Sequence, residues 1–161
     1  PKDIYIKEVK IVSDDFHSRF STKKKEYRYV INLGERDVFL NKRVYDCFYK
    51  LDLDLFKKTA ALFIGRHDFT SFNTSTFEEA QDQTRVIEDI KIISKDDLLI
   101  VEIVGEGFLR HMVRMLVGTM IDVARGQKSL RDVEKMLAEP SKDYHVYNVS
   151  PYGLYLVKIY Y

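Results

Sequence analysis

The sequence predicts an α+β fold, with a mainly antiparallel sheet and helices on one face. Three observations support this class. About six segments have the alternation or the β-branched and aromatic composition of strands. Three others have the apolar spacing of helices. Their order along the chain is mixed and their links resemble hairpins, whereas a parallel doubly wound sheet requires a more regular alternation of strands and helices.

Local patterns place the individual elements. Strands are expected at residues 4–12, 26–33, 84–93, 98–104 and 151–161, and helices at residues 52–64, 108–125 and 129–137. Asp52 or Asp54 can cap the first helix, and Ser129 with Asp132 three residues later forms the N-terminal pattern of the last. The acidic turn at residues 96–97 joins two strands and indicates a hairpin.

Composition limits the kind of protein. With 161 residues, 45% of them hydrophobic, the chain is expected to form one domain over residues 1–161. The net charge is only +1, so a nucleic-acid partner must be argued from where cations cluster. The single cysteine, Cys47, excludes an intrachain disulfide and indicates a reducing compartment, the cytoplasm. No apolar run reaches the roughly 18 residues of a membrane span, and no secretory signal is present. Because the chain starts at Pro1, we interpret it as a fragment or a processed chain.

The strand at residues 26–33 follows a run of three lysines, residues 23–25. Aromatic and basic residues are interleaved here, with Tyr27 on one face and Arg28 on the other. This arrangement suits RNA, because bases stack on rings while cations hold phosphates. It is equally typical of a half-buried strand preceded by a solvated basic run.

His67 and Asp68 are adjacent and invite an acid–base or metal interpretation. Neighbouring residues of an extended segment point apart, and the other three histidines are isolated in the sequence. We therefore interpret residues 66–72 as a packed, hydrogen-bonded turn, and we expect no metal site.

Residues 105–118 carry the strongest functional signal. They read as a glycine-flexed turn that leads into a helix so rich in apolar residues that it should be buried. Arg110, His111 and Arg114 are expected in its first two turns, where the helix dipole disfavours cations. Either these side chains reach water or pair with a carboxylate such as Glu106, or an anion binds there.

From residue 14 to residue 161 the sequence resembles the C-terminal domain of the bacterial tRNA pseudouridine synthase A family. The resemblance rests on six motifs in order: Asp15-Phe16-His17-Ser18-Arg19-Phe20-Ser21, Tyr27-Arg28-Tyr29, Gly65-Arg66-His67-Asp68-Phe69-Thr70-Ser71-Phe72, Thr84-Arg85-Val86-Ile87, Gly107-Phe108-Leu109-Arg110-His111-Met112-Val113-Arg114 and Gly153-Leu154-Tyr155-Leu156. It implies one of two α+β domains that meet at an RNA-binding cleft. It also implies an enzyme, usually a homodimer, that isomerises uridine in the tRNA anticodon stem-loop without metal or organic cofactor.

The resemblance assigns roles to particular residues. Tyr27 matches the tyrosine that packs against the target uracil, and Arg114 the arginine that pairs with the catalytic aspartate. Gly118, one turn along the same helix face, would let another element approach closely. Further RNA contacts are expected from basic residues, namely Arg19, Lys23, Lys24, Lys25, Arg28, Arg110 and His111.

One part of the family pattern is absent. The nucleophilic aspartate belongs to an Arg-Thr-Asp-Gly-Val-His-like motif of the N-terminal domain, and this chain has no such motif. Asp68, which precedes Phe69, does not replace it. We therefore expect the chain alone to be inactive and to need the N-terminal domain. Two other classes stay open, a non-catalytic RNA-binding module and a structural or dimerisation domain.

Overall fold

The computed structural model describes residues 2–161 and confirms the α+β class. The strands are β1 (Lys24–Asn32), β2 (Tyr45–Asp46), β3 (Gly65–Asp68), β4 (Thr84–Lys95), β5 (Leu98–Gly105) and β6 (Leu154–Tyr160). The helices are α1 (Leu53–Leu62), α2 (Met112–Ala124) and α3 (Leu130–Ala138), with short 3₁₀ helices at Val38–Leu40 and Thr70–Phe72. None of the helices within residues 2–161 combines the length and hydrophobicity needed to cross a bilayer.

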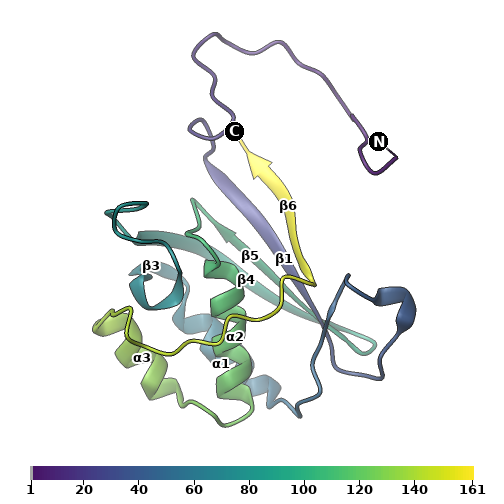
Figure 1. The fold of residues 1–161 in the computed structure, drawn as a ribbon, viewed down its shortest axis with the longest axis vertical. Coiled ribbons are helices and arrows are strands. Elements are labelled where there is room, and N and C mark those ends of the chain that lie inside the picture. The colour runs from purple at the N-terminus through teal and green to yellow at the C-terminus, as the bar shows by residue number, and fades with distance from the viewer. Residues whose placement is uncertain (1) are drawn as a thin grey trace.

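The six strands form one sheet in which β1 has three neighbours (Figure 1). The strand order is β2-β1-β5-β4-β3. Along the edge of β1 that faces away from β5, β6 pairs with the first part of β1 and β2 pairs with its last two residues. All pairings are antiparallel except that of β1 with β2. In the register of β1 and β5, Tyr29 lies opposite Val101 and Ile31 opposite Leu99, so apolar residues of both strands share one face.

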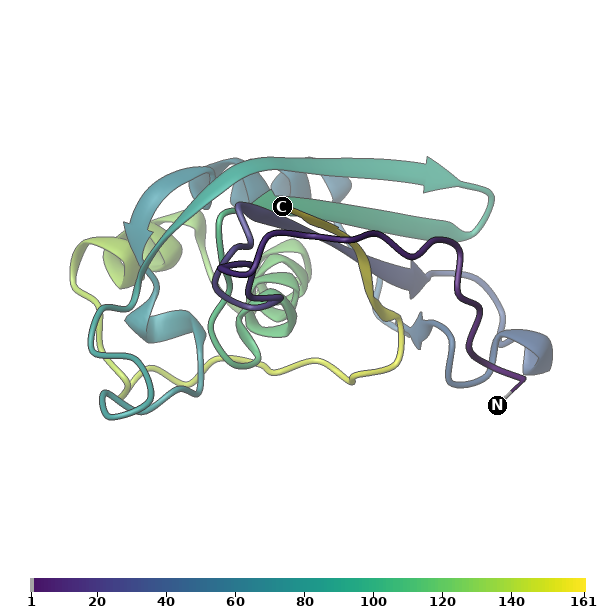
Figure 2. The same ribbon diagram turned by 90° about the horizontal axis from the view of Figure 1, so that it is seen from above.

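The two faces of the sheet differ in chemistry. On the apolar face α1 and α2 pack against the strands, and Figure 2 shows α2 (green) directly below the sheet. The opposite face carries charged pairs between strands. Arg28 Nη2 lies 2.6 Å from Glu102 Oε1, and Lys24 Nζ lies 3.0 Å from Glu88 Oε2. Alternation along β1 therefore separates Tyr27 from Arg28 and Lys24.

Helix α2 lies between the sheet and an irregular segment of the chain. Every residue of α2 is buried except Arg114, which confirms the expected burial. Residues 144–151, here called the strap, run between α3 and β6 and cross α2 on the side away from the sheet (Figures 1 and 2). A methyl group added at Gly118 would overlap the carbonyl oxygen of Tyr147. The expected close approach at Gly118 is thus confirmed, and the strap is the element that makes it.

The caps of α1 and α3 agree with the sequence. The Asp52 side chain accepts from the amides of Asp54 and Leu55, although α1 ends two residues earlier than expected. Ser129 and Asp132 form a reciprocal capping box at the start of α3.

Removing the Ser129 hydroxyl should destabilise the chain. Ser129→Ala removes the side-chain acceptor of the Asp132 amide and leaves it only the backbone carbonyl of residue 129, and an N-cap of this kind contributes about 1 kcal/mol. Urea denaturation should show that loss with an unchanged m-value. Ser94→Ala, an exposed serine of β4, is the control and should change stability by less than about 0.5 kcal/mol. Equal effects of the two variants would contradict the capping role.

Two expectations about strands were wrong, and one short strand was not expected. Residues 4–12 form no strand, because none of the described strands pairs with them and their apolar side chains are exposed. Residues 65–68, expected as part of a turn, form β3, because their backbone pairs with residues 84–87 of β4. The two-residue strand β2 was not expected, because only its long-range pairing with β1 makes it a strand.

Candidate active site

A hollow of about 180 Å³ opens beside the first turn of α2. The hollow is smaller than typical small-molecule pockets, which measure roughly 300–1,000 Å³. Its size suits one planar ring. Its walls come from β1, from the turn before α2 with the first turn of α2, and from the start of β6. The lining residues are Tyr27, Phe108, Leu109, His111, Met112, Val113, Arg114, Pro151 and Leu154.

Tyr27 forms one side of the hollow. Its ring meets Phe108 edge to face, with centroids 5.1 Å apart and an interplanar angle of 79°. Burial raises the pKa of the Tyr27 phenol, so its hydroxyl stays protonated at neutral pH. The site therefore offers a fixed, neutral aromatic surface to a ligand.

Arg114 also lines the hollow and is held by the strap. Its Nε donates to the carbonyl oxygen of Val149 at 2.6 Å. The next strap residue is also held, because the Tyr29 hydroxyl donates to the carbonyl oxygen of Ser150 at 2.7 Å. Within residues 2–161 no carboxylate forms an ion pair with Arg114. Nη1 and Nη2 thus remain available for an anion.

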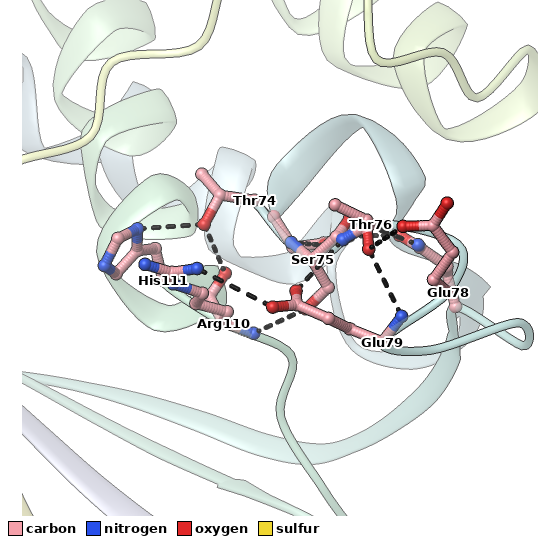
Figure 3. A network of polar contacts seen from close by, with 9 residues as sticks. Thr74, Ser75, Thr76, Glu78, Glu79, Arg110 and His111 are labelled. Carbon is pink, nitrogen blue, oxygen red and sulfur yellow. Dashed lines mark hydrogen bonds and ion pairs between the residues drawn. The ribbon is translucent and has the colours of Figure 1, made fainter.

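His111 and Arg110 lie just before α2. Both were expected within the helix, but α2 begins at Met112, because His111 takes the left-handed conformation (φ 61°) in which a helix cannot continue. Its Nδ1 lies 2.9 Å from the Thr74 hydroxyl oxygen (Figure 3). Burial lowers the pKa of the imidazole, and the charges of Arg114 and Arg110 add to this effect. His111 is therefore neutral at pH 7.

Arg110 is joined to the loop at residues 74–79 (Figure 3). Its backbone amide donates to Ser75 Oγ at 3.1 Å, and its carbonyl accepts from the Thr74 amide at 3.0 Å. The guanidinium is exposed, and Nη1 is 3.8 Å from Glu79 Oε1, a weak pairing at a solvated surface. The backbone of Arg110 is thus fixed while its side chain extends into solvent.

Comparison with known proteins identifies the family. A family model described as tRNA pseudouridine synthase matches residues 59–161. The chain belongs to this family. It is 40% identical over 162 residues to tRNA pseudouridine synthase A of Bacillus licheniformis, covering 100% of the chain and 65% of the relative. It is 38% identical over 156 residues to tRNA pseudouridine synthase A of Anoxybacillus flavithermus, covering 97% and 63%. The chain thus spans less than two thirds of the length of these relatives.

The other basic residues expected from the pseudouridine synthase resemblance do not all lie near the hollow. Lys24 and Arg28 belong to the opposite face of the sheet and are paired there with carboxylates. Lys25 follows the alternation of Tyr27 and lies opposite Gly105 at the end of β5. Lys23 precedes β1, and its amide donates to the Tyr160 carbonyl. The site itself therefore contains Tyr27, Arg114 and His111, with Arg110 at its rim.

Arg19 lies outside the site, in the loop before β1. Its guanidinium carbon is 5.7 Å from the centroid of the Phe20 ring, and Phe20 is itself exposed. The structure gives Arg19 no ion pair within residues 2–161. Its side chain can therefore meet a phosphate only at the outer surface.

His67 and Asp68 have local roles. His67 Nε2 lies 3.1 Å from the Ile64 carbonyl, and Asp68 Oδ1 accepts from the amide and hydroxyl of Thr70 at 2.8 and 2.6 Å. Residues 2–161 contain no group of three or more His, Cys, Asp or Glu side chains that could hold a metal ion.

Sequence reasoning missed the strap and the apolar wall of the site. The Val149 carbonyl that holds Arg114 is a backbone group, so no residue type could have indicated it. Phe108 and Leu154 stand in two of the motifs that carry the family resemblance, and that position was the available signal. Pro151 stands outside these motifs, and its residue type indicated only a turn.

Proposed function

We propose that this chain forms part of a tRNA pseudouridine synthase and supplies one half of its active site. Tyr27 packs against the target uracil, and Arg114 holds the nucleophilic aspartate, which the remaining part of the longer protein contributes. The observation that carries the proposal is the placement of Arg114. Its Nε is bound by the strap, its terminal nitrogens pair with no carboxylate of residues 2–161, and Arg114 lines a ring-sized hollow together with Tyr27.

This arrangement suits the chemistry of uridine isomerisation. The C1′–N1 bond is exchanged for a C1′–C5 bond, while C5 loses a proton and N1 gains one. A base can react in this way only after leaving its stack, and packing against Tyr27 would offset part of that cost. The Arg114 fork would bind the carboxylate through two hydrogen bonds and keep it ionised as a nucleophile. The chain's own residues thus orient both reactants.

The RNA contacts follow from charge and placement. Arg110 and Lys25 are the expected phosphate contacts near the hollow, with Arg19 and Lys23 further along the RNA. Lys24 and Arg28 should contribute less, because each already pairs with a carboxylate on the far face. The partners we propose are tRNA, the N-terminal domain and a second copy of the enzyme, and the proposed location is the cytoplasm.

The test compares this chain with the longer protein that contains it. A mass-shift or tritium-release assay on tRNA should detect pseudouridine with the longer protein and none with the chain alone. Comparable rates for the two would contradict the proposed division of the site. The absence of pseudouridine with both would reject the proposed function.

A binding measurement separates the two alternatives. The chain alone should bind tRNA with an affinity that falls as salt rises, because its contacts are to phosphates. Binding without activity in the longer protein would favour a non-catalytic RNA-binding module. No salt-dependent binding, and no loss in Arg110→Gln, would favour a structural or dimerisation domain.

A further inference from the structure

The backbone of His111 adopts the left-handed conformation, which is uncommon for residues other than glycine. Its φ is 61° and its ψ is 1°, a region that asparagine, aspartate and histidine adopt more often than the remaining residues. The residue caps no helix amide through its side chain. His111 instead lines the hollow together with Tyr27 and Arg114. This uncommon backbone conformation occurs at a residue that lines the site.

The protein binds one nitrogen of the His111 ring and leaves the other without a hydrogen bond among residues 2–161. Nδ1 lies 2.9 Å from the Thr74 hydroxyl and 3.4 Å from the Asn148 amide nitrogen, so the ring is held between a loop and the strap. Every hydrogen bond of the ring within residues 2–161 involves Nδ1. In Figure 3 the second nitrogen, Nε2, points away from Thr74.

The same contacts set the tautomer. The Asn148 amide nitrogen can only donate, and the Thr74 hydroxyl can donate to Nδ1 as well. With the Asn148 amide oriented as it is in the structure, Nδ1 is the acceptor and the proton of the neutral ring is on Nε2. Burial and the two neighbouring arginines lower the pKa of His111 and keep the ring neutral. The site therefore contains one neutral N–H donor beside the aromatic surface of Tyr27.

We propose that His111 is a substrate-binding residue whose Nε2–H donates to a carbonyl oxygen of the uracil. This inference rests on the proposed function and adds the group that recognises the base. A flipped base is commonly read through hydrogen bonds to its Watson–Crick edge, and uracil presents carbonyl oxygens to such a donor. A neutral donor also leaves the aspartate to Arg114, whereas an imidazolium would compete for that carboxylate.

The geometry of the isomerisation favours a donor of this kind. To exchange N1 for C5 at the reacting sugar carbon, the detached ring must turn over about its N3–C6 axis. That rotation also interchanges the O2 and O4 oxygens. One fixed N–H at this position can therefore bind one carbonyl before the rotation and the other after it, so His111 would hold the base in both orientations.

The test uses His111→Asn in the longer protein. Asparagine tolerates the left-handed conformation, and its side-chain oxygen can replace Nδ1 as acceptor for Thr74, but it provides no group at the Nε2 position. We expect kcat to fall about tenfold, the effect of one hydrogen bond, with little change in KM because phosphate contacts dominate tRNA affinity. His111→Gln, whose amide nitrogen can reach the Nε2 position, should recover part of the loss. His145→Asn, in the exposed part of the strap, should leave both constants unchanged.

Sulfur-substituted substrates separate binding from a purely structural role. tRNA with 2-thiouridine or 4-thiouridine at the modified position offers a poorer acceptor. At least one of them should slow the wild-type protein and slow His111→Asn much less, since that contact is already lost. An unchanged kcat in His111→Asn, or an equal sulfur effect in both proteins, would overturn the assignment while the proposed function stands. A wild-type protein that forms no pseudouridine would reject both.

Discussion

Arg114→Lys is expected to lower the rate of pseudouridine formation by the longer protein by about a hundredfold or more. Lysine keeps the charge but offers a single ammonium in place of a planar fork. It cannot donate to the Val149 carbonyl and hold both oxygens of a carboxylate at once. A nucleophile misplaced by about 1 Å is enough to cost about a hundredfold in rate. The loss should appear in kcat measured with saturating tRNA.

The fold should tolerate this change, which makes the rate interpretable. The hydrogen bond to Val149 is the only Arg114 contact of its kind within residues 2–161, so Arg114→Lys should cost about 1 kcal/mol of unfolding free energy. Arg131→Lys, an exposed arginine of α3, is the matched control and should alter neither rate nor stability. A rate within threefold of wild type for Arg114→Lys would show that Arg114 does not orient the nucleophile.

The local parts of the fold could be predicted from the sequence. The β4–β5 hairpin, the buried helix α2 and the N-caps of α1 and α3 depend on residues close together in the chain, and each is found, although α2 begins only at Met112. β2 and β3 could not be predicted in this way, because they become strands only through pairing with β1 and β4. The prediction of a strand at residues 4–12 was wrong for the converse reason. Alternation shows only that a segment is able to pair, and none of the described strands pairs with this one.

The site could be predicted only in part, for a similar reason. The density of apolar residues around Arg114 indicated that a cation lay in an unusual place, and the structure puts it at the hollow. Alternation already placed Arg28 and Tyr27 on opposite faces of β1, but it could not show which face bounds the hollow or that Arg28 pairs with Glu102 on the other. The left-handed conformation of His111 was also invisible, since no glycine or asparagine marks it. Residue types indicated the chemistry, and the backbone determined which groups meet.

Gly118→Ala is expected to destabilise the chain, although alanine is the better helix former. In an open helix the change would stabilise by about 1 kcal/mol. Here the added methyl overlaps the backbone oxygen of Tyr147, which cannot turn aside as a side chain would. Overpacking of this kind costs about 1–3 kcal/mol, and more when backbone must move. Urea denaturation should therefore show a net loss of about 2 kcal/mol.

The strap cannot simply move away from the methyl group, because it is held at Tyr147 and at the residues that follow it. The Tyr147 hydroxyl bonds to the Tyr45 hydroxyl at 3.0 Å, and the next strap residues hold Arg114 and Tyr29 through Val149 and Ser150. Any shift that relieves the overlap must displace the Val149 carbonyl and turn the Arg114 fork. Gly118→Ala in the longer protein should therefore have a lower kcat even under conditions where the variant is fully folded.

A second glycine provides the control for this prediction. Gly107→Ala introduces the same methyl group, but the nearest atom is Arg85 Cδ at 3.7 Å, an ordinary van der Waals distance. Its stability should stay within about 1 kcal/mol of wild type, since restricting the unfolded chain favours alanine. If Gly118→Ala proved as stable as Gly107→Ala and kept its rate, the strap would be free to move. Arg114 would then need some other group to fix its orientation.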